Sequence, residues 1–296
     1  MEFARLSNIL QDNKRQFMVK SIMQIKEWSK VNHNAQLDVG LLQARYVQHA
    51  YPRHSHDYYV ICLIERGRQS FTHKGTQHLT PAGGVILINP GAVHTGEAVD
   101  EQGFEMRSIY PTTSHMQMAA FELTGCGQAV PFFREVRVDD PFVMKSVLSI
   151  HKAMSDEADA MERESKFVSM LAQLIKKYAD FPFTEQKLGN ERKAIHRAKL
   201  FIEEYFAQGV SLNLLAQHVA LSPYYLLRAF SAEVGMPPHA YLESVRIRNA
   251  QRLIEIGHPL TEIALAVGFS SQSHMTNRFK KIIGVTPGQY AGQIHH

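Results

Sequence analysis

The chain has 296 residues, 45% of them hydrophobic and 20% charged, which is ordinary for a globular protein large enough to hold two domains. No stretch approaches 18 consecutive apolar residues, and the first twenty residues have no continuous apolar core, so the sequence predicts neither a membrane-spanning helix nor a signal peptide. A cytoplasmic location follows as the expectation, with Cys62 and Cys126 as two reduced thiols far apart in the sequence.

The positive charge is concentrated at one end of the chain. Residues 1–189 carry 21 Lys and Arg against 21 Asp and Glu, whereas residues 190–296 carry 11 against 7, which together give the net charge of +4. A local excess of basic side chains favours a surface that binds phosphate groups.

Three segments precede the basic part of the chain. Residues 1–36 are polar apart from residues such as Trp28, and they predict a helical or flexible arm or, as an alternative, a disordered leader. Residues 37–112 hold short β-branched and aromatic runs broken by Gly and Pro, a pattern typical of a sandwich or barrel. Within it, Tyr58–Ile64, a turn at Glu65–Arg68 and Gln69–His73 predict a β-hairpin.

Residues 113–181 predict a helical region that could serve dimerisation. Apolar side chains recur there at steps of three and four residues, namely Met161, Phe167, Val168, Leu171, Leu174, Ile175 and Tyr178. Asp156 and Glu157 stand at the expected start of this helix, and Lys176 and Lys177 near its end. The helix could pack on the barrel or pair with its copy in a dimer. Residues 182–192 contain Pro182 and Gly189 and predict a linker.

Residues 193–296 contain an internal duplication. Five residues of the segment 211–241 recur 49 positions later, and the pairs are Phe230 and Phe279, Val234 and Ile283, Gly235 and Gly284, Pro238 and Pro287, and Tyr241 and Tyr290. Chance agreement at five spaced positions is improbable, so the sequence indicates two copies of one unit.

Each copy has the pattern of a helix, a tight turn and a second helix. Apolar residues at helical spacing form the first helix of each copy, and they are Leu212, Leu215, Ala216 and Val219, then Leu260, Ile263, Ala264 and Val267. Gly268 suits a left-handed turn, and Ser222 and Ser271 can cap the following helices, with Pro223 in the first turn. Such a helix-turn-helix places its second helix in the major groove of DNA.

The second helix of each copy divides into a core face and an outer face. Residues spaced by four form the core face, and they are Leu226, Phe230 and Val234, then Met275, Phe279 and Ile283. The outer faces carry Tyr224, Leu227 and Arg228, then Gln272, Ser273, Thr276 and Asn277. Arg can read guanine, Asn or Gln can read adenine, and an apolar side chain can contact the thymine methyl group. The predicted phosphate contacts are Ser222, Ser271, Arg278, Lys280 and Lys281.

Residues 195–293 resemble the AraC/XylS family of bacterial transcription regulators. The resemblance rests on LLAQHVALSPYYLLRAFSAEVGMPPHAYL, RIRNAQRLI and PLTEIALAVGFSSQSHMTNRFKKIIGVTPGQY. It implies two units on one chain, joined by the helix around Tyr241 to Ile256, that enter successive major grooves on one face of the DNA. The family pattern places base contacts at Tyr224, Leu227, Arg228, Gln272, Ser273, His274 and Asn277. Many members carry a basic residue where this chain has Asn277.

Residues 40–110 resemble the cupin-type effector-binding domain that often precedes this DNA-binding domain. The resemblance rests on HSHDYY, on Glu65-Arg66-Gly67 and on NPGAVHT. Enzymatic cupins bind a metal through an HxH pair, a nearby glutamate and a later histidine. His54, His56 and His94 match three of these positions, but Val60 and Ile61 occupy the region of the glutamate. Because this family usually lacks metal, we expect no metal and no cofactor there. The expected effector site comprises Arg53, His54, His56, Tyr58 and His94.

The sequence therefore predicts an α+β protein of two domains. The first is a cupin-like β-barrel with flanking helices, and the second is an all-α domain with two helix-turn-helix units joined by a central helix. The expected function is a sequence-specific, effector-responsive transcription regulator, with activation the commoner mode of the family. Its expected partners are double-stranded DNA, a small-molecule effector, RNA polymerase and a second copy of the chain. The alternative is a metal-dependent cupin enzyme with an attached DNA-binding module, but the duplication favours a regulator without catalytic residues.

Overall fold

A computed structural model describes residues 26–124, 130–155, 158–180 and 188–294 of the chain. Residues 1–25 of the predicted arm, Cys126, Asp156, Glu157 and Pro182 of the predicted linker lie outside the described residues. The chain divides into two compact units, of which one comprises residues 1–113 and 133–147 and the other residues 114–132 and 148–296. Among the described residues, none of the helices combines the length and the apolar character that crossing a lipid bilayer requires.

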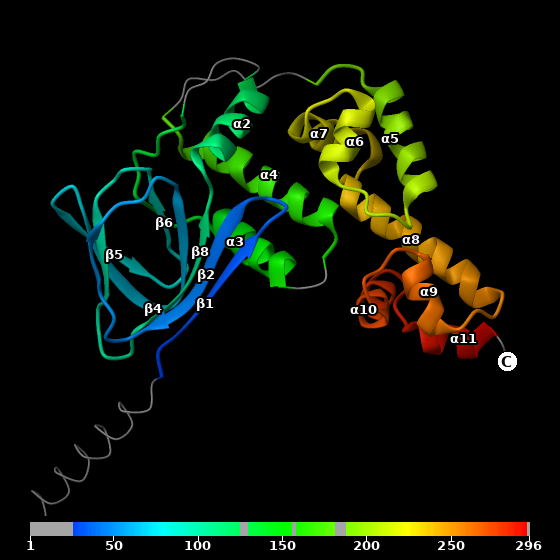
Figure 1. The fold of residues 1–296 in the computed structure, drawn as a ribbon, viewed down its shortest axis with the longest axis horizontal. Coiled ribbons are helices and arrows are strands. Elements are labelled where there is room, and N and C mark those ends of the chain that lie inside the picture. Colours follow the sequence, from blue (N-terminus) through cyan, green and yellow to red (C-terminus); the bar gives the residue numbers. More distant parts are fainter. Residues whose placement is uncertain (1–25, 125–129, 156–157, 181–187, 295–296) are drawn as a thin grey trace, which may run out of the picture. The chain divides into compact units, whose positions relative to one another are not determined.

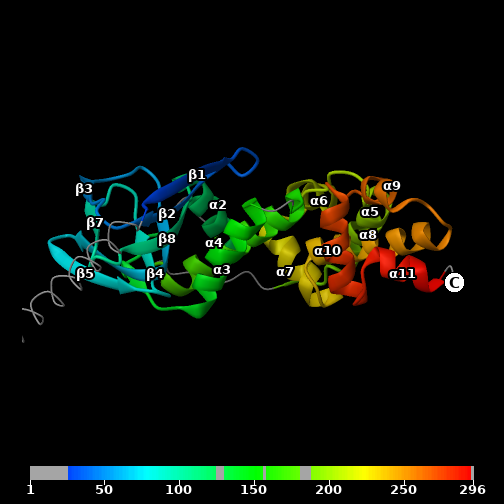
Figure 2. The ribbon, with the colours of Figure 1, turned by 90° about the horizontal axis from the view of Figure 1, so that it is seen from below.

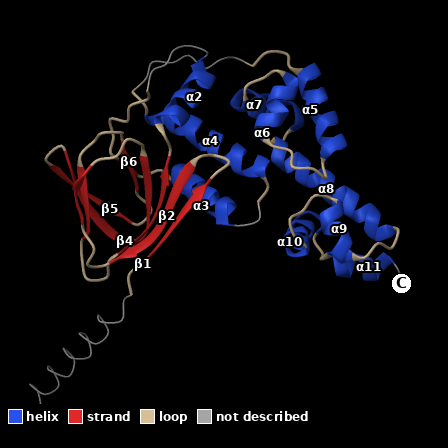
Figure 3. Ribbon diagram, viewed as in Figure 1, coloured by secondary structure: helices blue, strands red, loops and turns tan. Residues whose placement is uncertain are grey.

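The first unit is a β-barrel-like sandwich (Figures 1 and 3). Its strands are β1 (Trp28–Asn34), β2 (Val39–Tyr46), β3 (Tyr51–His54), β4 (Val60–His73), β5 (Thr76–Pro81), β6 (Val85–Ile88), β7 (His94–Ala98), β8 (Phe104–Tyr110) and β9 (Arg137–Val138). They pair in the order β1-β2-β8-β4-β6-β9, while β3 pairs with β7, and β5 and β7 both pair with β4. The predicted fold class is confirmed for this unit.

Strand β4 joins the two sheets of the sandwich. Its first half, Val60–Leu63, pairs with β6, and its second half, Arg68–His73, pairs with β5. The predicted hairpin turn at Glu65–Arg68 is therefore wrong, because the strand continues through it. Gly67 at φ 72° and a register shift between Ile64 and Arg66 bend the strand there, and the hairpin turn falls at Lys74 and Gly75 instead.

The arm prediction also differs from the structure where the structure describes it. Residues Trp28–Asn34 form strand β1, which pairs antiparallel with all of β2 between Val39 and Arg45. The strand is almost wholly exposed, so its side chains give little apolar periodicity from which a strand could be recognised.

An apolar core lies between the two sheets of the first unit. It is formed by alternate side chains of the strands, in particular Leu42, Ala44, Val60, Cys62, Ile64, Phe71, Ile86, Ile88, Phe104 and Met106. Cys62 is buried in this core as a free thiol, as the sequence predicts. The alternation places these residues on the inner face because successive side chains of a strand point to opposite sides.

Helices build the second unit. They are α2 (Thr113–Thr124), the end of α3 (Pro141–Ser155), α4 (Ala160–Tyr178), α5 (Arg192–Tyr205), α6 (Leu212–Val219), α7 (Pro223–Val234), α8 (Pro238–Glu255), α9 (Leu260–Ala266), α10 (Gln272–Ile283) and α11 (Pro287–Ile294). Helices α7 and α10 have the same length and are offset by the 49 residues that the sequence indicates, so the predicted duplication is confirmed.

The two helix-turn-helix units share the caps of their second helices and differ by one residue in the turn. The hydroxyl groups of Ser222 and Ser271 accept hydrogen bonds from the N–H groups of Tyr225 and His274, and so cap the starts of α7 and α10. Gly235 and Gly284 end these helices in the left-handed conformation. The first helices are offset by only 48 residues, from Leu212 to Leu260.

Helix α8 supplies the cores of both units. Its first half gives Leu242 and Val245 to one core, and its second half gives Ile247, Ala250 and Ile254 to the other. The predicted core faces are confirmed, since Leu226, Phe230, Met275 and Phe279 are all fully buried.

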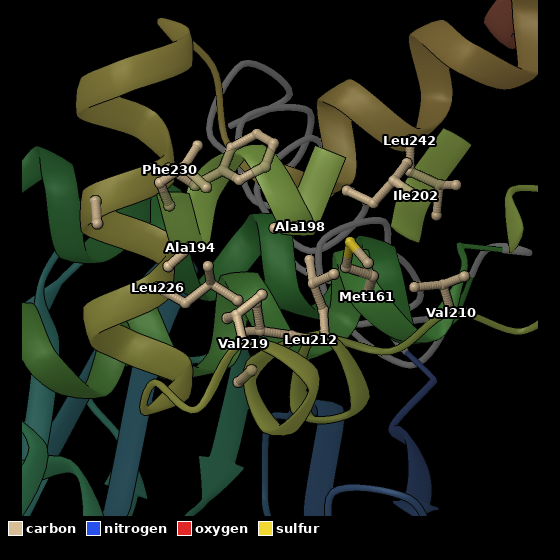
Figure 4. Packing of buried hydrophobic residues seen from close by; sticks show 14 of the residues in the cluster. Met161, Ala194, Ala198, Ile202, Val210, Leu212, Val219, Leu226, Phe230 and Leu242 are labelled. Atoms are coloured by element: carbon tan, nitrogen blue, oxygen red, sulfur yellow. The ribbon is translucent and has the colours of Figure 1, made fainter. Parts of the chain in front are cut away.

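One residue from outside the duplicated segment completes the core of the first helix-turn-helix. Met161 of α4 is fully buried among residues of α5 to α8, such as Leu212 and Val219 (Figure 4). Of the apolar stripe predicted for this helix, Met161 thus packs within the second unit, where α4 contacts α6, α7 and α8.

Candidate DNA-binding surface and effector cavity

Helix α10 presents the second predicted reading face. Gln272, Ser273 and Asn277 are exposed, and His274 is half-buried. The ring of His274 lies between Ser270 and Arg278, with its Nδ1 atom 3.2 Å from the Ser270 hydroxyl and its Nε2 atom 3.3 Å from Arg278 Nε. The capping bond from Ser271 fixes the start of the helix, so these side chains project from its first two turns.

Helix α7 differs from α10, although the two have the same place in the repeat. Tyr224 and Leu227, two predicted base contacts, are only 4% and 8% exposed. Arg228 is half-buried, and its guanidinium carbon lies 5.7 Å from the centre of the Tyr224 ring. The first reading face is therefore covered by other residues of the second unit in this conformation.

Two carboxylates bind helix N-termini of the first helix-turn-helix. The Asn213 N–H, at the start of α6, donates to Glu164 Oε2 at 3.1 Å, and the Tyr224 N–H, at the start of α7, donates to Glu122 Oε2 at 2.7 Å. Glu164 lies on α4 and is 3% exposed, and Glu122 lies on α2. Helix N-termini attract anions because their N–H groups are unpaired and the helix dipole is positive there.

Two further carboxylates at the start of α4 bind arginines of the DNA-binding segment. Glu162 Oε2 lies 2.8 Å from Arg278 Nη2, and Asp159 Oδ2 lies 3.0 Å from Arg246 Nη1. Glu243 also approaches Arg278, at 3.2 Å. Burial raises the pKa of Glu162, but the hydrogen bond from Lys166 and the charges of Lys166 and Arg278 outweigh it, so the pKa is lowered. Glu162 therefore carries its negative charge at neutral pH.

The predicted phosphate contacts are in three different situations. Ser222 and Ser271 use their hydroxyl groups as helix caps, and Arg278 is engaged by Glu162. Lys280 and Lys281 are exposed. A groove of about 800 Å³ lies between α10, the C-terminal end of α3 and the N-terminal end of α4. Its lining residues are Ser149, Lys152, Ala153, Ser155, Ala158, Glu162, Lys166, Ser273, His274, Asn277, Arg278 and Lys281.

The first unit encloses a cavity of about 250 Å³ between its sheets. Four of the five predicted effector residues line it, namely His54, His56, Tyr58 and His94. Arg53 is exposed and is not among the lining residues. The remaining lining residues are Val31, Leu42, Tyr51, Val60, Cys62, Gln69, Phe71, Ile86, Ile88, Thr95, Met106, Ser108 and Tyr110. The cavity is thus mostly apolar, with its polar groups gathered at the histidines.

The three histidines meet beside the pair formed by β3 and β7, which lie side by side in Figure 2. One ring nitrogen of each of His54, His56 and His94 lies within 4.8 Å of the others. His54 and His94 are directly opposed across the strand pair, with ring centres 4.4 Å apart. Burial and the charges of His54 and His94 lower the pKa of His56 to about 4, and burial lowers the pKa of His94. Both side chains are therefore neutral at pH 7.

Sequence reasoning missed the lining residues that come from the middle of the strands. Gln69, Ser108 and Tyr110 place amide and hydroxyl groups at the cavity. The alternation of side chains along β4 and β8 could have assigned them to the inner face, but the bend in β4 shifts that alternation by one residue partway along the strand.

Comparisons with known proteins agree with both parts of the chain. Residues 36–171 match the AraC-like ligand binding domain family, and residues 215–293 match a helix-turn-helix domain family. The uncharacterized HTH-type transcriptional regulator YbfI of Bacillus subtilis is 34% identical over 77% of this chain and 82% of its own length. The HTH-type transcriptional activator RhaS of Klebsiella pneumoniae is 24% identical over 83% of this chain and 89% of its own length.

Among solved structures, a transcriptional regulator with an AraC-type DNA-binding domain from Chromobacterium violaceum is 25% identical. The match covers 35% of this chain and 94% of that chain, with a TM-score of 0.34.

Proposed function

The chain belongs to the AraC family of HTH-type transcription regulators, and from this premise we propose how it reads DNA and how an effector controls it. It is a DNA-binding regulator and not an enzyme, with an effector-binding domain ahead of its two helix-turn-helix units. The observation that carries the proposal is the repeated pair of helices, α6 with α7 and α9 with α10, in which a serine caps the second helix of each pair.

Helices α7 and α10 read the bases of two successive major grooves. Arg228 binds guanine, Asn277 and Gln272 bind adenine, and Leu227 contacts a thymine methyl group. Tyr224, Ser273 and His274 complete the base-reading set. Lys280 and Lys281 are exposed at the end of α10 and bind phosphate, together with Arg278 and the N-terminal turns that begin at Ser222 and Ser271.

The conformation described here is a closed one. Tyr224 and Leu227 cannot reach a base while they are buried, and the carboxylates of Glu122 and Glu164 occupy helix N-termini of the kind that bind DNA phosphates. The Glu162 carboxylate forms an ion pair with Arg278 and so neutralises the charge that this arginine would offer to a phosphate. Helices α2 and α4 therefore compete with DNA for the helix-turn-helix units, and DNA binding requires their release.

The effector binds in the cavity of the first unit. The lining favours a small molecule that is largely apolar and carries a polar or anionic group, which His54, His56, His94 and Tyr58 receive. Differential affinity of the effector for the closed and open states would supply the free energy that shifts the equilibrium between them.

Three finer features belong to the same proposal. The regulator activates transcription, as the relative RhaS does according to its name, and it does so in contact with RNA polymerase. It works as a homodimer, because linkage of two DNA-binding segments raises their joint affinity. It acts in the cytoplasm, where a bacterial chromosome is found.

The test is a gel shift with promoter DNA and two fragments of the chain. Residues 190–296 are expected to shift the probe and residues 1–189 are not, because both helix-turn-helix units and the basic excess lie in the first fragment. Because this fragment lacks Glu122, Glu162 and Glu164, it should bind DNA more tightly than the full chain without effector. Binding by residues 1–189 alone would overturn the proposed function.

A further inference from the structure

The groove between α10, the C-terminal end of α3 and the N-terminal end of α4 gathers positive charge from three helices. Four of its lining side chains are cationic, with Lys152 on α3, Lys166 on α4, and Arg278 and Lys281 on α10. Glu162 is the one carboxylate among the lining residues. The groove therefore has an excess of positive charge, which attracts anions and raises their local concentration.

The carboxylate of Glu162 compensates only part of this charge. Its Oε1 atom lies 2.7 Å from Lys166 Nζ and its Oε2 atom lies 2.8 Å from Arg278 Nη2, so both of its oxygens are engaged. Lys152 and Lys281 are exposed, and neither forms an ion pair within the described part of the chain. Two ammonium groups, one on α3 and one on α10, are thus available to a ligand.

The rest of the lining favours a compact and highly polar ligand. Three serines and Asn277 offer hydroxyl and amide groups, which can donate hydrogen bonds to phosphate oxygens. The apolar side chains of the lining are those of Ala153 and Ala158, so the groove gives a hydrocarbon chain little to pack against. Its volume of about 800 Å³ is that of a site for a small molecule.

We propose that this groove binds a small molecule with two or more phosphate groups, which links α3 and α4 to α10. Lys152 and Lys166 bind one end of the ligand, and Arg278 and Lys281 bind the other. Hydrogen bonds between such cations and phosphate are charge-assisted and are therefore stronger than neutral ones. A ligand with several phosphates can form them with cations of all three helices at once.

A ligand in this groove should compete with DNA. It engages Arg278 and Lys281, two of the residues that we propose for phosphate contact, and it holds α10 against the helices that cover it in the closed conformation. A molecule that binds one of two states shifts the equilibrium toward that state. This step rests on the proposed function, whereas the phosphate site itself does not. The site lies in the second unit and is separate from the effector cavity of the first.

The test of the site is calorimetric titration of the effector-free full chain with inorganic tripolyphosphate at constant ionic strength. One ligand per chain is expected to bind. Lys152→Gln and Lys281→Gln should each weaken binding about 10-fold, because each removes a charge-assisted hydrogen bond. Lys145→Gln and Lys280→Gln are the matched controls and should bind as the parent does, since they remove the same charge from α3 and α10 at positions that do not line the groove.

Three results of this titration would overturn the site. The first is an absence of saturable binding by the parent. The second is equal weakening in all four variants, because the ligand would then respond to net charge alone. The third is orthophosphate that binds as tightly as tripolyphosphate, since a single phosphate would then suffice and the ligand would not link the helices.

Gel shifts of promoter DNA with Lys152→Gln test the competition, because Lys152 lies outside the DNA-binding segment. Without tripolyphosphate, this variant should bind DNA as the parent does. At a concentration ten times the parent's Kd for it, tripolyphosphate should weaken DNA binding about 10-fold in the parent and about 2-fold in the variant. Lys145→Gln should behave as the parent.

The possible failures can be told apart. Tripolyphosphate that binds in the titration but leaves the DNA affinity of the parent unchanged would overturn the competition and not the site. Equal inhibition of the parent and Lys152→Gln would overturn the competition as well, because the ligand would then act elsewhere on the DNA-binding surface. A parent chain that shifts no promoter DNA in the absence of tripolyphosphate is instead a failure of the proposed function.

Discussion

Two residues in the turns of the duplicated units show how position dictates residue type. Ala220 and Gly268 occupy equivalent left-handed positions, at φ 58° and φ 87°, because the first helices of the repeat are related by 48 residues. A left-handed conformation costs a residue with a Cβ atom about 1–2 kcal/mol. At Gly268 a Cβ atom would also lie 2.9 Å from backbone atoms of Phe206 and Ala207, so this position admits glycine alone.

Substitution of these two residues should therefore have opposite effects on stability. Gly268→Ala is expected to lower the free energy of unfolding by more than about 1–2 kcal/mol, since it combines backbone strain with a clash. Ala220→Gly should change it little or raise it by up to about 1 kcal/mol, because the strain is relieved. Urea denaturation followed by circular dichroism measures both. Equal destabilisation by the two substitutions would show that the turn conformations are not as described.

Arg228 and Lys280 should differ in what they contribute to DNA binding. Arg228→Ala is expected to weaken specific binding by about 1–3 kcal/mol and to relax base preference at one position. Lys280→Ala should weaken binding to all sequences alike and reduce the slope of log K against log salt by about one unit. Gel shifts on specific and random DNA across a salt series distinguish the two.

The control for this comparison is Phe279→Ala, which removes a fully buried ring and should cost about 3–5 kcal/mol of stability. Circular dichroism of all three variants separates loss of fold from loss of contact. An Arg228 variant that loses specific and random binding equally would assign that residue to phosphate contact.

Elements with strong local signals could be predicted from the sequence, and elements whose limits depend on distant partners could not. Caps and apolar spacing located α7 and α10, because both signals lie within the helix itself. The turn chemistry of Glu65–Arg68 was misleading, since pairing of β4 with β8 carries the strand through a bend at Gly67. Likewise, periodicity located the helix α4 but could not say what covers its apolar stripe.

The candidate site could likewise be predicted only where its signals are local in the sequence. The histidines of the cavity follow from a short motif, and their convergence needs only the pairing of β3 with β7. The burial of Tyr224 and Leu227 could not be predicted, because it depends on helices that lie far from them in the sequence. A single sequence records which face of α7 is apolar, but not whether a protein helix or DNA covers it.

Helix α4 should act as an inhibitory element through its carboxylates. Glu162→Gln and Glu164→Gln are each expected to raise the affinity of the effector-free chain for promoter DNA, because each weakens a contact that the DNA must displace. Glu233→Gln is the matched control, since Glu233 is a more exposed carboxylate on α7 and the change removes the same charge. If the control raises affinity as much, the gain reflects net charge and not release of α4.

At the scale of the whole molecule, the packing of α4 changes where a dimer interface can lie. The stripe that the sequence offers for dimerisation, around Phe167 and Leu171, is buried within a single chain. Helix α2 instead exposes two large apolar side chains one turn apart, Met118 at 62% and Phe121 at 55%. Isolated apolar side chains are common on surfaces, but a neighbouring pair on one helix face suits a contact with a second copy.

We therefore expect the full chain to sediment as a dimer at micromolar concentrations and Phe121→Glu to convert it to a monomer. A charge introduced at the centre of an apolar contact remains unpaired there, whereas the same change at exposed Leu200 on α5 should leave the dimer intact. Loss of the dimer should weaken binding to a promoter with two half-sites by about 100-fold or more, because the second contact is no longer intramolecular. Binding to one half-site should be unchanged. A wild-type chain that remains monomeric with and without DNA would contradict the homodimer.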